Sequence, residues 1–271
     1  MPTKPRRSAG TKPRPPSSAA RTDPRPHPGV ELVDGLRAGL AVFSRRRHDI
    51  VRIAHSALVR AEVQDLSRWA KGHGVPCSEV TAAELDRIAG SDHHEGLCTI
   101  ARLRPWLPAH DLGDLLAYNN ATAIALDRVR NPYNVGAILR SAAFFGIDAL
   151  LCGAPAPGPE LSPIAVRVAE GGVEHLRCCR TTDLASTLSR LRARGVHVIG
   201  ADAHAGASAR GYPFARPAVL VVGHEREGLS ARVRAECEAF VAVRGTGAIE
   251  SLNVAVAAGV LLGELAGATR P

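Results

Sequence analysis

The sequence predicts an α/β protein in which a mostly parallel sheet, with helices on both faces, follows a smaller α/β unit. Between residues 121 and 267, five short apolar runs alternate with segments of helical periodicity. Short buried strands separated by helices are typical of parallel sheets that helices cover on both sides. Residues 104–108 contain two prolines and interrupt this regularity, so we place the junction between the two units there.

The first 29 residues have a composition of their own. They carry seven Lys or Arg residues against one Asp, and eight prolines lie among serines and other small residues. Such a stretch cannot bury a core, so we expect a disordered basic arm over residues 1–29. The arm suits an RNA partner, because Lys and Arg side chains that bind phosphates release the counterions of the RNA and so favour binding. A solubilising terminus explains the composition equally well.

The smaller unit is predicted over residues 30–103. Residues 50–55 have the pattern of a strand, and residues 58–72 have that of an amphipathic helix ending at glycine. Thr81 and Glu84 have the spacing of a capping box, which predicts that a helix begins there. The apolar run at residues 96–101 predicts a further strand. Residues 104–120 are expected to link this unit to the second.

The larger unit is predicted over residues 121–271. Its apolar runs predict strands at residues 124–129, 149–152, 196–199, 218–222 and 240–243. Three of these runs are followed by short polar or glycine-rich turns, each of which leads into a helical pattern. Because open parallel sheets bind ligands at the carboxyl ends of their strands, three such turns indicate one pocket.

The first turn precedes a helix that should continue to Phe145. Asn134 is well placed to cap this helix, because a short polar side chain can accept hydrogen bonds from the first free amides. Arg140 projects from the side opposite the apolar stripe. From periodicity alone, an arginine in this place is more often a solvated surface residue than part of a site.

The second turn leaves the strand at Gly223 and passes through Gly228 to Ser230, a plausible N-cap for a helix over residues 231–240. Such a turn offers free backbone amides to a ligand. Glu225 follows the strand directly. A carboxylate in this place suits a site and a solvated surface equally well.

The third turn contains Gly245 and Gly247, which permit close approach of the backbone to a ligand. Ser251 can cap the last helix, and Asn253 is expected in its first turn. The turn lacks the third glycine and the acidic residue of a dinucleotide fingerprint, so the sequence favours NAD binding only weakly.

The sequence lacks the motifs of several other classes of protein. There is no Walker sequence and no GxSxG elbow. His93, His94 and Glu95 have no second ligand pair at helical spacing, so no metal is expected. The longest apolar stretch, residues 252–266, is too short to span a bilayer. Six cysteines without CxxC spacing, and no export signal, predict reduced thiols in the cytoplasm and no membrane partner.

Taken together, residues 131–140, 223–230 and 245–253 resemble the three motifs of the SpoU (TrmH) family of S-adenosylmethionine-dependent RNA ribose 2′-O-methyltransferases. The three motifs occur in the family's order. The first unit resembles the ribosomal-protein-like RNA-binding domain of several members. Residues 93–96, 169–172 and 245–247 look closest to the YfiF-type branch of the family.

The resemblance implies a SPOUT-type fold with a trefoil knot at the carboxyl end of the sheet, a rare feature that the strand pattern could not predict. It implies a homodimer whose active site is shared between subunits. S-adenosylmethionine would be the cofactor, held by backbone near Gly223, Gly228, Val243 and Leu252. The substrate would be rRNA or tRNA.

The resemblance also assigns roles to five polar residues. Arg140 would take the central role in methyl transfer, and the other four would position substrate, cofactor or Arg140 itself: Asn134, Glu225, Ser251 and Asn253. A guanidinium normally stays protonated, so Arg140 as a general base needs an unusual environment. A clamp that binds a phosphate and stabilises the developing alkoxide is the equally good interpretation.

Three residues depart from the pattern of many relatives. Where those read Gly-Asn-Glu-Gly in the second motif, this chain has His224 and Arg226 around Glu225, and Arg244 stands where many have proline after the last strand. These changes affect substrate choice and pocket shape more than reaction type. A non-enzymatic RNA-binding or ribosome-assembly factor of the same fold is the main alternative, and methylation of a base rather than a ribose is a third.

Overall fold

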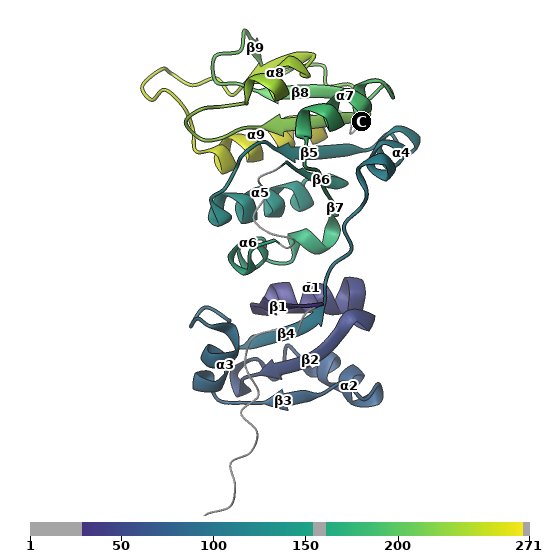
Figure 1. The fold of residues 1–271 in the computed structure, drawn as a ribbon. Coiled ribbons are helices and arrows are strands. Elements are labelled where there is room, and N and C mark those ends of the chain that lie inside the picture. Colours follow the sequence, from purple (N-terminus) through teal and green to yellow (C-terminus); the bar gives the residue numbers. More distant parts are fainter. Residues whose placement is uncertain (1–28, 154–160, 268–271) are drawn as a thin grey trace, which may run out of the picture.

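The computed structural model describes residues 29–153 and 161–267. The predicted basic arm, apart from Gly29, lies outside these residues. Figure 1 shows two units stacked along one axis, with the small sheet at one end and the large sheet at the other. The chain passes once between them, from β4 to α4.

The first unit is a four-stranded sheet with three α-helices. Its elements are β1 (Val30–Asp34), α1 (Leu36–Arg46), η1 (Arg47–Asp49), β2 (Ile50–His55), η2 (Ala57–Val59), α2 (Gln64–Gly72), β3 (Cys77–Glu79), α3 (Ala82–Ala89) and β4 (Leu97–Arg102). The strand order is β1-β4-β2-β3. Strand β4 is antiparallel to β1 and β2, and β3 is parallel to β2.

The predicted capping box at the start of α3 is confirmed. The Thr81 hydroxyl accepts a hydrogen bond from the Glu84 amide at 3.3 Å, and the Glu84 carboxylate accepts one from the Thr81 amide at 2.9 Å. The helix predicted over residues 58–72 begins only at Gln64. Residues 57–63 form a 3-10 turn and irregular turns that bury Val59 and Val63.

The second unit is built around a seven-stranded sheet. Its elements are α4 (Ala109–Asn119), β5 (Thr122–Leu126), α5 (Pro132–Phe144), β6 (Ala149–Cys152), α6 (Pro163–Val168), η3 (Gly172–His175), β7 (Arg177–Arg180), α7 (Leu184–Arg192), β8 (His197–Ala201), β9 (Ala207–Ser208), β10 (Ala218–Val222), α8 (Ala231–Ala235), β11 (Ala239–Ala242) and α9 (Val254–Gly267). The strand order is β7-β6-β5-β10-β8-β11-β9, and the pairings among these strands are parallel.

Alternating side chains along the interior strand β5 point to the two faces of this sheet. Ile124 and Leu126 belong to the core formed with α5, α6 and α9, which continues into the first unit. Ala123 and Ala125 point the other way, into the core formed with α4, α7 and α8. The predicted parallel sheet with helices on both faces is therefore confirmed.

The predicted linker, residues 104–120, contains the helix α4. Leu112 and Leu116, four residues apart, are fully buried on one side of this helix. They pack into the same core as α7 and β7. Just before the helix, the Leu107 amide donates to the Cys178 carbonyl at 2.7 Å, which fixes the start of this segment to the edge strand β7. The proline-rich signal at residues 104–108 thus marks a short connection.

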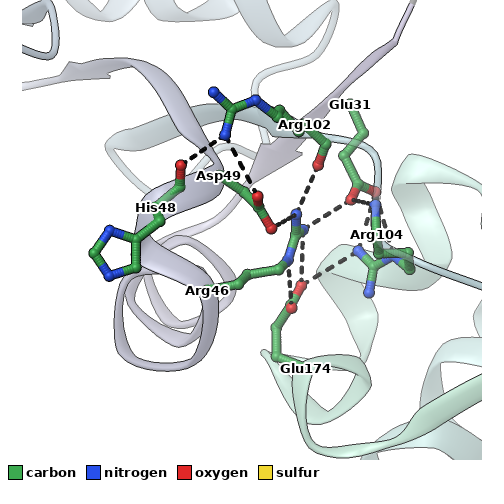
Figure 2. A network of polar contacts seen from close by, with 7 residues as sticks. All are labelled: Glu31, Arg46, His48, Asp49, Arg102, Arg104 and Glu174. Carbon is green, nitrogen blue, oxygen red and sulfur yellow. Dashed lines mark hydrogen bonds and ion pairs between the residues drawn. The ribbon is translucent and has the colours of Figure 1, made fainter.

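A buried network of charged side chains joins the two units (Figure 2). Arg46 of α1 contacts Glu31 at 2.8 Å within its own unit and Glu174 of η3 at 2.7 Å in the other unit. Arg104 contacts Glu31 at 3.0 Å and Glu174 at 3.3 Å. These four side chains are between 4% and 12% exposed. Two cations and two anions therefore compensate one another away from water.

The environment of Arg46 shows how the network is balanced. Burial by itself lowers the pKa of Arg46, but the hydrogen bond and charge of Glu174, with the charges of Glu31 and Asp49, raise the pKa above its ordinary value. A second ion pair, between Arg167 of α6 and Asp34 of β1 at 2.7 Å, spans the same junction. The relative placement of the two units is thus fixed by buried charge as well as by the shared apolar core.

Candidate functional site

The main cavity lies at the carboxyl ends of β8, β10 and β11, the edge at which parallel sheets bind their ligands. Its volume is about 1150 Å³, and its walls are residues 201–204, 222–229 and 241–252 together with the inner side of α9. A shallower hollow of about 560 Å³ adjoins it and shares residues 224–226. The hollow is lined by Arg130, Asn131, Asn134, His224, Glu225, Arg226 and Asn253.

Three of the predicted site residues form one hydrogen-bonded chain in this hollow. The Asn134 side-chain amide donates to Glu225 Oε1 at 2.6 Å, and the Asn253 amide donates to Asn134 Oδ1 at 3.1 Å. Each residue comes from a different segment of the sequence. The three turns therefore meet at one edge of the sheet, as the spacing of the segments indicated.

The start of α5 corrects the predicted role of Asn134 as a helix cap. Asn131 is the N-cap, because its Oδ1 accepts from the Tyr133 amide at 3.0 Å, and Pro132 occupies the first helical position. Proline is favoured there because its missing N–H would have no partner in the helix. Asn134 lies one turn further on, and its side chain is consequently free to reach Glu225.

The start of α9 corrects the predicted cap in the third segment. Asn253 precedes the helix, and its Oδ1 accepts from the Ala255 amide at 2.8 Å and the Val256 amide at 3.4 Å. Asn253 therefore anchors the helix with its oxygen while its amide group contacts Asn134. Ser251 does not cap the helix; it is exposed and lines the main cavity.

The second segment forms a tight turn closed by its own backbone. His224 and Gly228 exchange backbone hydrogen bonds of 3.1 and 2.9 Å. A Cβ atom on Gly223 would lie 2.4 Å from the Gly228 carbonyl, and Gly228 itself has φ +65°, so both positions require glycine. The helix predicted over residues 231–240 ends at Ala235, because Phe240 belongs to β11.

Ser230 precedes α8, but its side chain makes no capping hydrogen bond. Its backbone amide donates to Asp127 Oδ2 at 2.6 Å instead, which ties the second turn to the end of β5. Arg128, next to Asp127, donates to the Gly228 carbonyl at 3.1 Å and pairs with Glu227. The end of β5 is therefore linked to the second segment by these contacts, in addition to the contact between Asn134 and Glu225.

The predicted cofactor-binding residues share one location. Gly223, Gly228, Val243 and Leu252 all line the main cavity. Arg244, which departs from the family pattern, donates to the carbonyls of Ala205 at 2.6 Å and Gly206 at 2.5 Å. It thereby joins the start of the third turn to the loop after β8.

Arg140 lies apart from the other four predicted residues. It lines neither cavity, its side chain is 53% exposed, and it pairs with Glu170 Oε1 at 2.6 Å. Six residues along an α-helix correspond to a rotation of about 240° and a rise of about 9 Å, so Arg140 points away from Asn134. Within one polypeptide, Asn134, Glu225 and Asn253 lie together, and Ser251 lies nearby. Arg140 does not reach this group.

Two residues that line the hollow had no predicted role, although Asn131 begins the first predicted segment. Arg130 and Asn131 follow the end of β5, and both are exposed. The Asn-Pro pair at residues 131–132 is a helix-start signal that could have placed the cap at the edge of the sheet. No comparable local signal marks Arg130 as part of a pocket.

The other constellation weighed from the sequence contributes to structure. His94 contacts Asp86 at 3.1 Å, and Glu95 accepts from the Leu36 amide at 3.1 Å. Among residues 29–153 and 161–267, no group of three or more His, Cys, Asp or Glu side chains is arranged to hold a metal ion. Over the same ranges, every helix is too short or too polar to traverse a bilayer.

The fold and its edge site define an α/β protein with a cavity among glycine-containing turns of a parallel sheet. Residues 121–263 match the SpoU rRNA Methylase family. This chain belongs to that family.

Curated relatives include proteins with related names. A protein of Mycobacterium avium (strain 104), named an uncharacterized tRNA/rRNA methyltransferase, is 36% identical over 195 residues, covering 71% of this chain and 62% of that protein. The 23S rRNA (guanosine-2′-O-)-methyltransferase RlmB of Acinetobacter baylyi is 34% identical over 205 residues, covering 74% of this chain and 82% of that protein. The chain thus spans less than two thirds of the length of its mycobacterial relative.

Solved structures share the fold across both units. An AdoMet-bound rRNA methyltransferase from Sinorhizobium meliloti has a TM-score of 0.74 at 23% identity, covering 90% of this chain and 89% of its own. The SpoU methyltransferase AviRb from Streptomyces viridochromogenes, in complex with AdoMet, has a TM-score of 0.72 at 22% identity, covering 88% of this chain and 90% of its own. The predicted SPOUT-type fold class is therefore confirmed.

Proposed function

We propose that this protein transfers a methyl group from S-adenosylmethionine to a ribose 2′-hydroxyl in structured rRNA or tRNA. The observation that carries the proposal is the hydrogen-bonded chain Glu225–Asn134–Asn253, which joins three distant segments at the mouth of the main cavity. Membership of the SpoU family supports RNA methylation. The name of the Acinetobacter baylyi relative supports the ribose 2′-oxygen as acceptor.

The residues of the main cavity fit this cofactor. The cavity is large enough for a nucleoside-sized ligand, and Val222, Leu229 and Leu261 give it apolar walls. Gly223 and Gly228 let the backbone approach a ligand without a side chain between them. Two structural neighbours hold AdoMet. When bound, the cofactor supplies an electrophilic sulfonium methyl group, and residues around Gly223, Gly228, Val243 and Leu252 would hold it.

The smaller hollow suits the RNA backbone. Arg130 and Arg226 are exposed cations that line this hollow together with Glu225, Asn134 and Asn253. A ribose that presents its 2′-hydroxyl has a phosphate on each side, and guanidinium groups bind phosphates with paired hydrogen bonds. Asn134, Glu225 and Asn253 would then fix the ribose, which lowers the barrier by orienting the hydroxyl toward the methyl group.

Arg140 would complete the site from a second subunit. It lies outside both cavities of its own chain, so a homodimer is the arrangement that brings it to a cavity. Four exposed apolar side chains on α5 and α9 support this interface: Tyr133, Phe144, Val256 and Val260. In that setting Arg140 would act as an electrostatic clamp for phosphate and developing alkoxide, with the hydroxyl proton leaving to another acceptor. The trefoil knot stays a prediction that accompanies this proposal.

A non-enzymatic RNA-binding or ribosome-assembly factor is the second candidate. The position of Arg140, paired with Glu170 and away from the cavity of its own chain, favours this candidate. A protein that only binds RNA has no need for a cofactor cradle. Calorimetry with S-adenosylmethionine therefore separates the two candidates: a binding isotherm supports the enzyme, and its absence in folded protein supports the RNA-binding factor.

The reaction is tested with purified protein, isotopically labelled S-adenosylmethionine and total bacterial RNA. Nuclease digestion followed by mass spectrometry of the nucleosides should place the label on ribose, and Arg140→Ala should abolish it in a protein that still binds cofactor. Label on a base would contradict the proposed acceptor. Mapping of the labelled position would identify the RNA, in the cytoplasmic setting that we propose for this chain.

The basic arm is tested in the same system. Removing residues 1–29 should weaken RNA binding and reduce its dependence on salt, since fewer counterions are then released. Cofactor affinity should not change. An unchanged salt dependence would contradict an RNA-binding arm and favour the solubilising interpretation.

A further inference from the structure

Glu170 contacts two arginines that come from different units. Its Oε1 pairs with Arg140 Nη1 of α5 at 2.6 Å, and its Oε2 pairs with Arg37 Nη1 of α1 at 2.6 Å. Each carboxylate oxygen therefore serves one guanidinium. The side chain is 26% exposed, less than Arg140 at 53% and Arg37 at 69%. Glu170 thus links Arg140 directly to the first unit.

The backbone at Glu170 has an unusual conformation. Its φ is +46°, in the left-handed region, which disfavours residues with a Cβ atom. Residues in such conformations persist where the surrounding structure fixes them, and they cluster at functional sites. A glycine here would relieve the backbone but would remove the carboxylate that both arginines contact. The conformation therefore accompanies a specific side-chain placement.

The two glycines that follow fix this placement from both sides. A Cβ atom on Gly171 would lie 2.5 Å from Ala41 Cβ in α1, and one on Gly172 would lie 3.1 Å from the Arg140 Cα in α5. The turn at residues 170–172 therefore packs closely between α1 and α5, the helices that carry Arg37 and Arg140. Because the buried network around Glu174 holds α1 in place, the carboxylate of Glu170 has a defined position relative to Arg140.

We propose that Glu170 is a positioning residue for Arg140, and that Arg37 anchors Glu170 from the first unit. This inference rests on the proposed methyl transfer. A long arginine side chain has many rotamers, and the pair with Glu170 restricts them before RNA binds. The packing of the first unit against the second is thereby coupled to the orientation of the Arg140 side chain. Exposed ion pairs contribute little to stability, so the effect of Glu170 should appear in activity rather than in folding.

The kinetic test compares Glu170→Gln with a matched exposed pair elsewhere. Arg60 and Glu79 form a pair of 2.6 Å in the first unit, so Glu79→Gln removes the same charge from the same kind of contact. We expect Glu170→Gln to lower kcat for RNA methylation about tenfold, with the KM for S-adenosylmethionine unchanged. Glu170→Asp should recover part of kcat, and Glu79→Gln should leave kcat unchanged.

A second measurement needs no turnover. Phenylglyoxal modifies arginines, and mass spectrometry follows the rate at Arg140. Glu170→Gln should raise this rate severalfold, Arg37→Ala should raise it less, and Glu79→Gln should not change it. An unchanged rate at Arg140 would overturn the pairing. A faster rate with an unchanged kcat would overturn the positioning role alone.

The two proposals fail in different ways. Wild-type protein that methylates no RNA would refute the proposed function, and the positioning role with it, while the phenylglyoxal rates would still decide the pairing. Wild-type activity that Arg140→Ala abolishes but Glu170→Gln leaves intact would retain the proposed function and refute only the inference about Glu170.

Discussion

The domain junction and the rim of the hollow use the same kinds of side chain in opposite ways. At the junction, Arg46 and Arg104 are almost fully buried, and each contacts both Glu31 and Glu174. At the rim, Arg130 and Arg226 are exposed, and within the described residues their guanidiniums have no ion-pair partner. Complete charge networks hold the units together, whereas the incomplete set at the rim suits a polyanion that supplies the missing charge.

The largest effect should come from breaking the junction. Glu174→Gln leaves two buried guanidiniums with one buried carboxylate, and loss of one partner from a buried network costs about 3–5 kcal/mol. We expect the free energy of unfolding, from chemical denaturation, to fall by that amount. Glu79→Gln, which breaks an exposed pair, should leave the free energy of unfolding close to that of the wild-type protein. Equal losses of unfolding free energy in the two variants would contradict the proposed difference between buried ion pairs at the junction and exposed ion pairs at the surface.

The next effect concerns the cavity itself. In Gly223→Ala, the added Cβ would lie 2.4 Å from Gly228 backbone atoms, which cannot move aside as a flexible side chain would. The second turn must then shift, and we expect affinity for S-adenosylmethionine to fall about 10- to 100-fold, corresponding to about 1–3 kcal/mol.

Gly245→Ala is the matched control for this change. Gly245 lines the same cavity, but a Cβ there has no atom within 4 Å. Its cofactor affinity, measured by calorimetry, should stay within about twofold of wild type. A loss as large as that of Gly223→Ala would show that the main cavity is sensitive to any substitution rather than to the closed turn.

A smaller effect is expected at the hydrogen-bonded chain of the rim. Asn134→Ala removes the contacts to Glu225 and Asn253, and hydrogen bonds of this kind contribute about 1 kcal/mol. We expect kcat/KM for RNA to fall about tenfold with little change in the free energy of unfolding. Asn119→Ala, at an exposed asparagine whose side-chain amide donates to the Leu115 carbonyl, should leave kcat/KM unchanged. A loss of stability without a loss of activity would make Asn134 structural.

The sequence predicted the sheet and the meeting of the three turns because both depend on local patterns. Runs such as residues 218–222 are apolar throughout, and strand β10 has those bounds. The helix caps were misplaced because Asn131, Asn134, Ser251 and Asn253 have similar propensities. Which of these residues caps a helix depends on the backbone conformation of the segment that leads into that helix.

The junction network and the Glu170 pairs could not be predicted from one sequence. Arg46 and Glu174 are 128 residues apart, and Arg37 and Glu170 are 133 apart. No periodicity relates residues at such separations, so only the docking of the units shows which charges are buried. The spacing of the leucines in α4 is a helix signal that the sequence does contain. The prolines before them favoured the prediction of a linker instead.

The smallest effect should report whether the junction is dry. Cys178 lies beside the network, and burial, opposed by Arg104 and reinforced by Glu174 and Glu31, raises the pKa of its thiol to about 11. The unfolded thiol has a pKa of about 8.5. Because the native state favours the protonated form, the stability that Cys178 contributes is fully present below pH 8.5 and is lost as the pH rises toward 11.

Between pH 8 and pH 9.5 this loss amounts to about 1 kcal/mol, and Cys178→Ala should lose correspondingly less stability over the same interval. Denaturation curves of both proteins at the two pH values measure the difference, which is independent of any constant cost of the substitution. Equal pH dependence in the two proteins would mean that the thiol ionises as readily in the native state as in the unfolded chain. Water would then reach the network, and the contrast between a dry junction and a solvated rim would no longer hold.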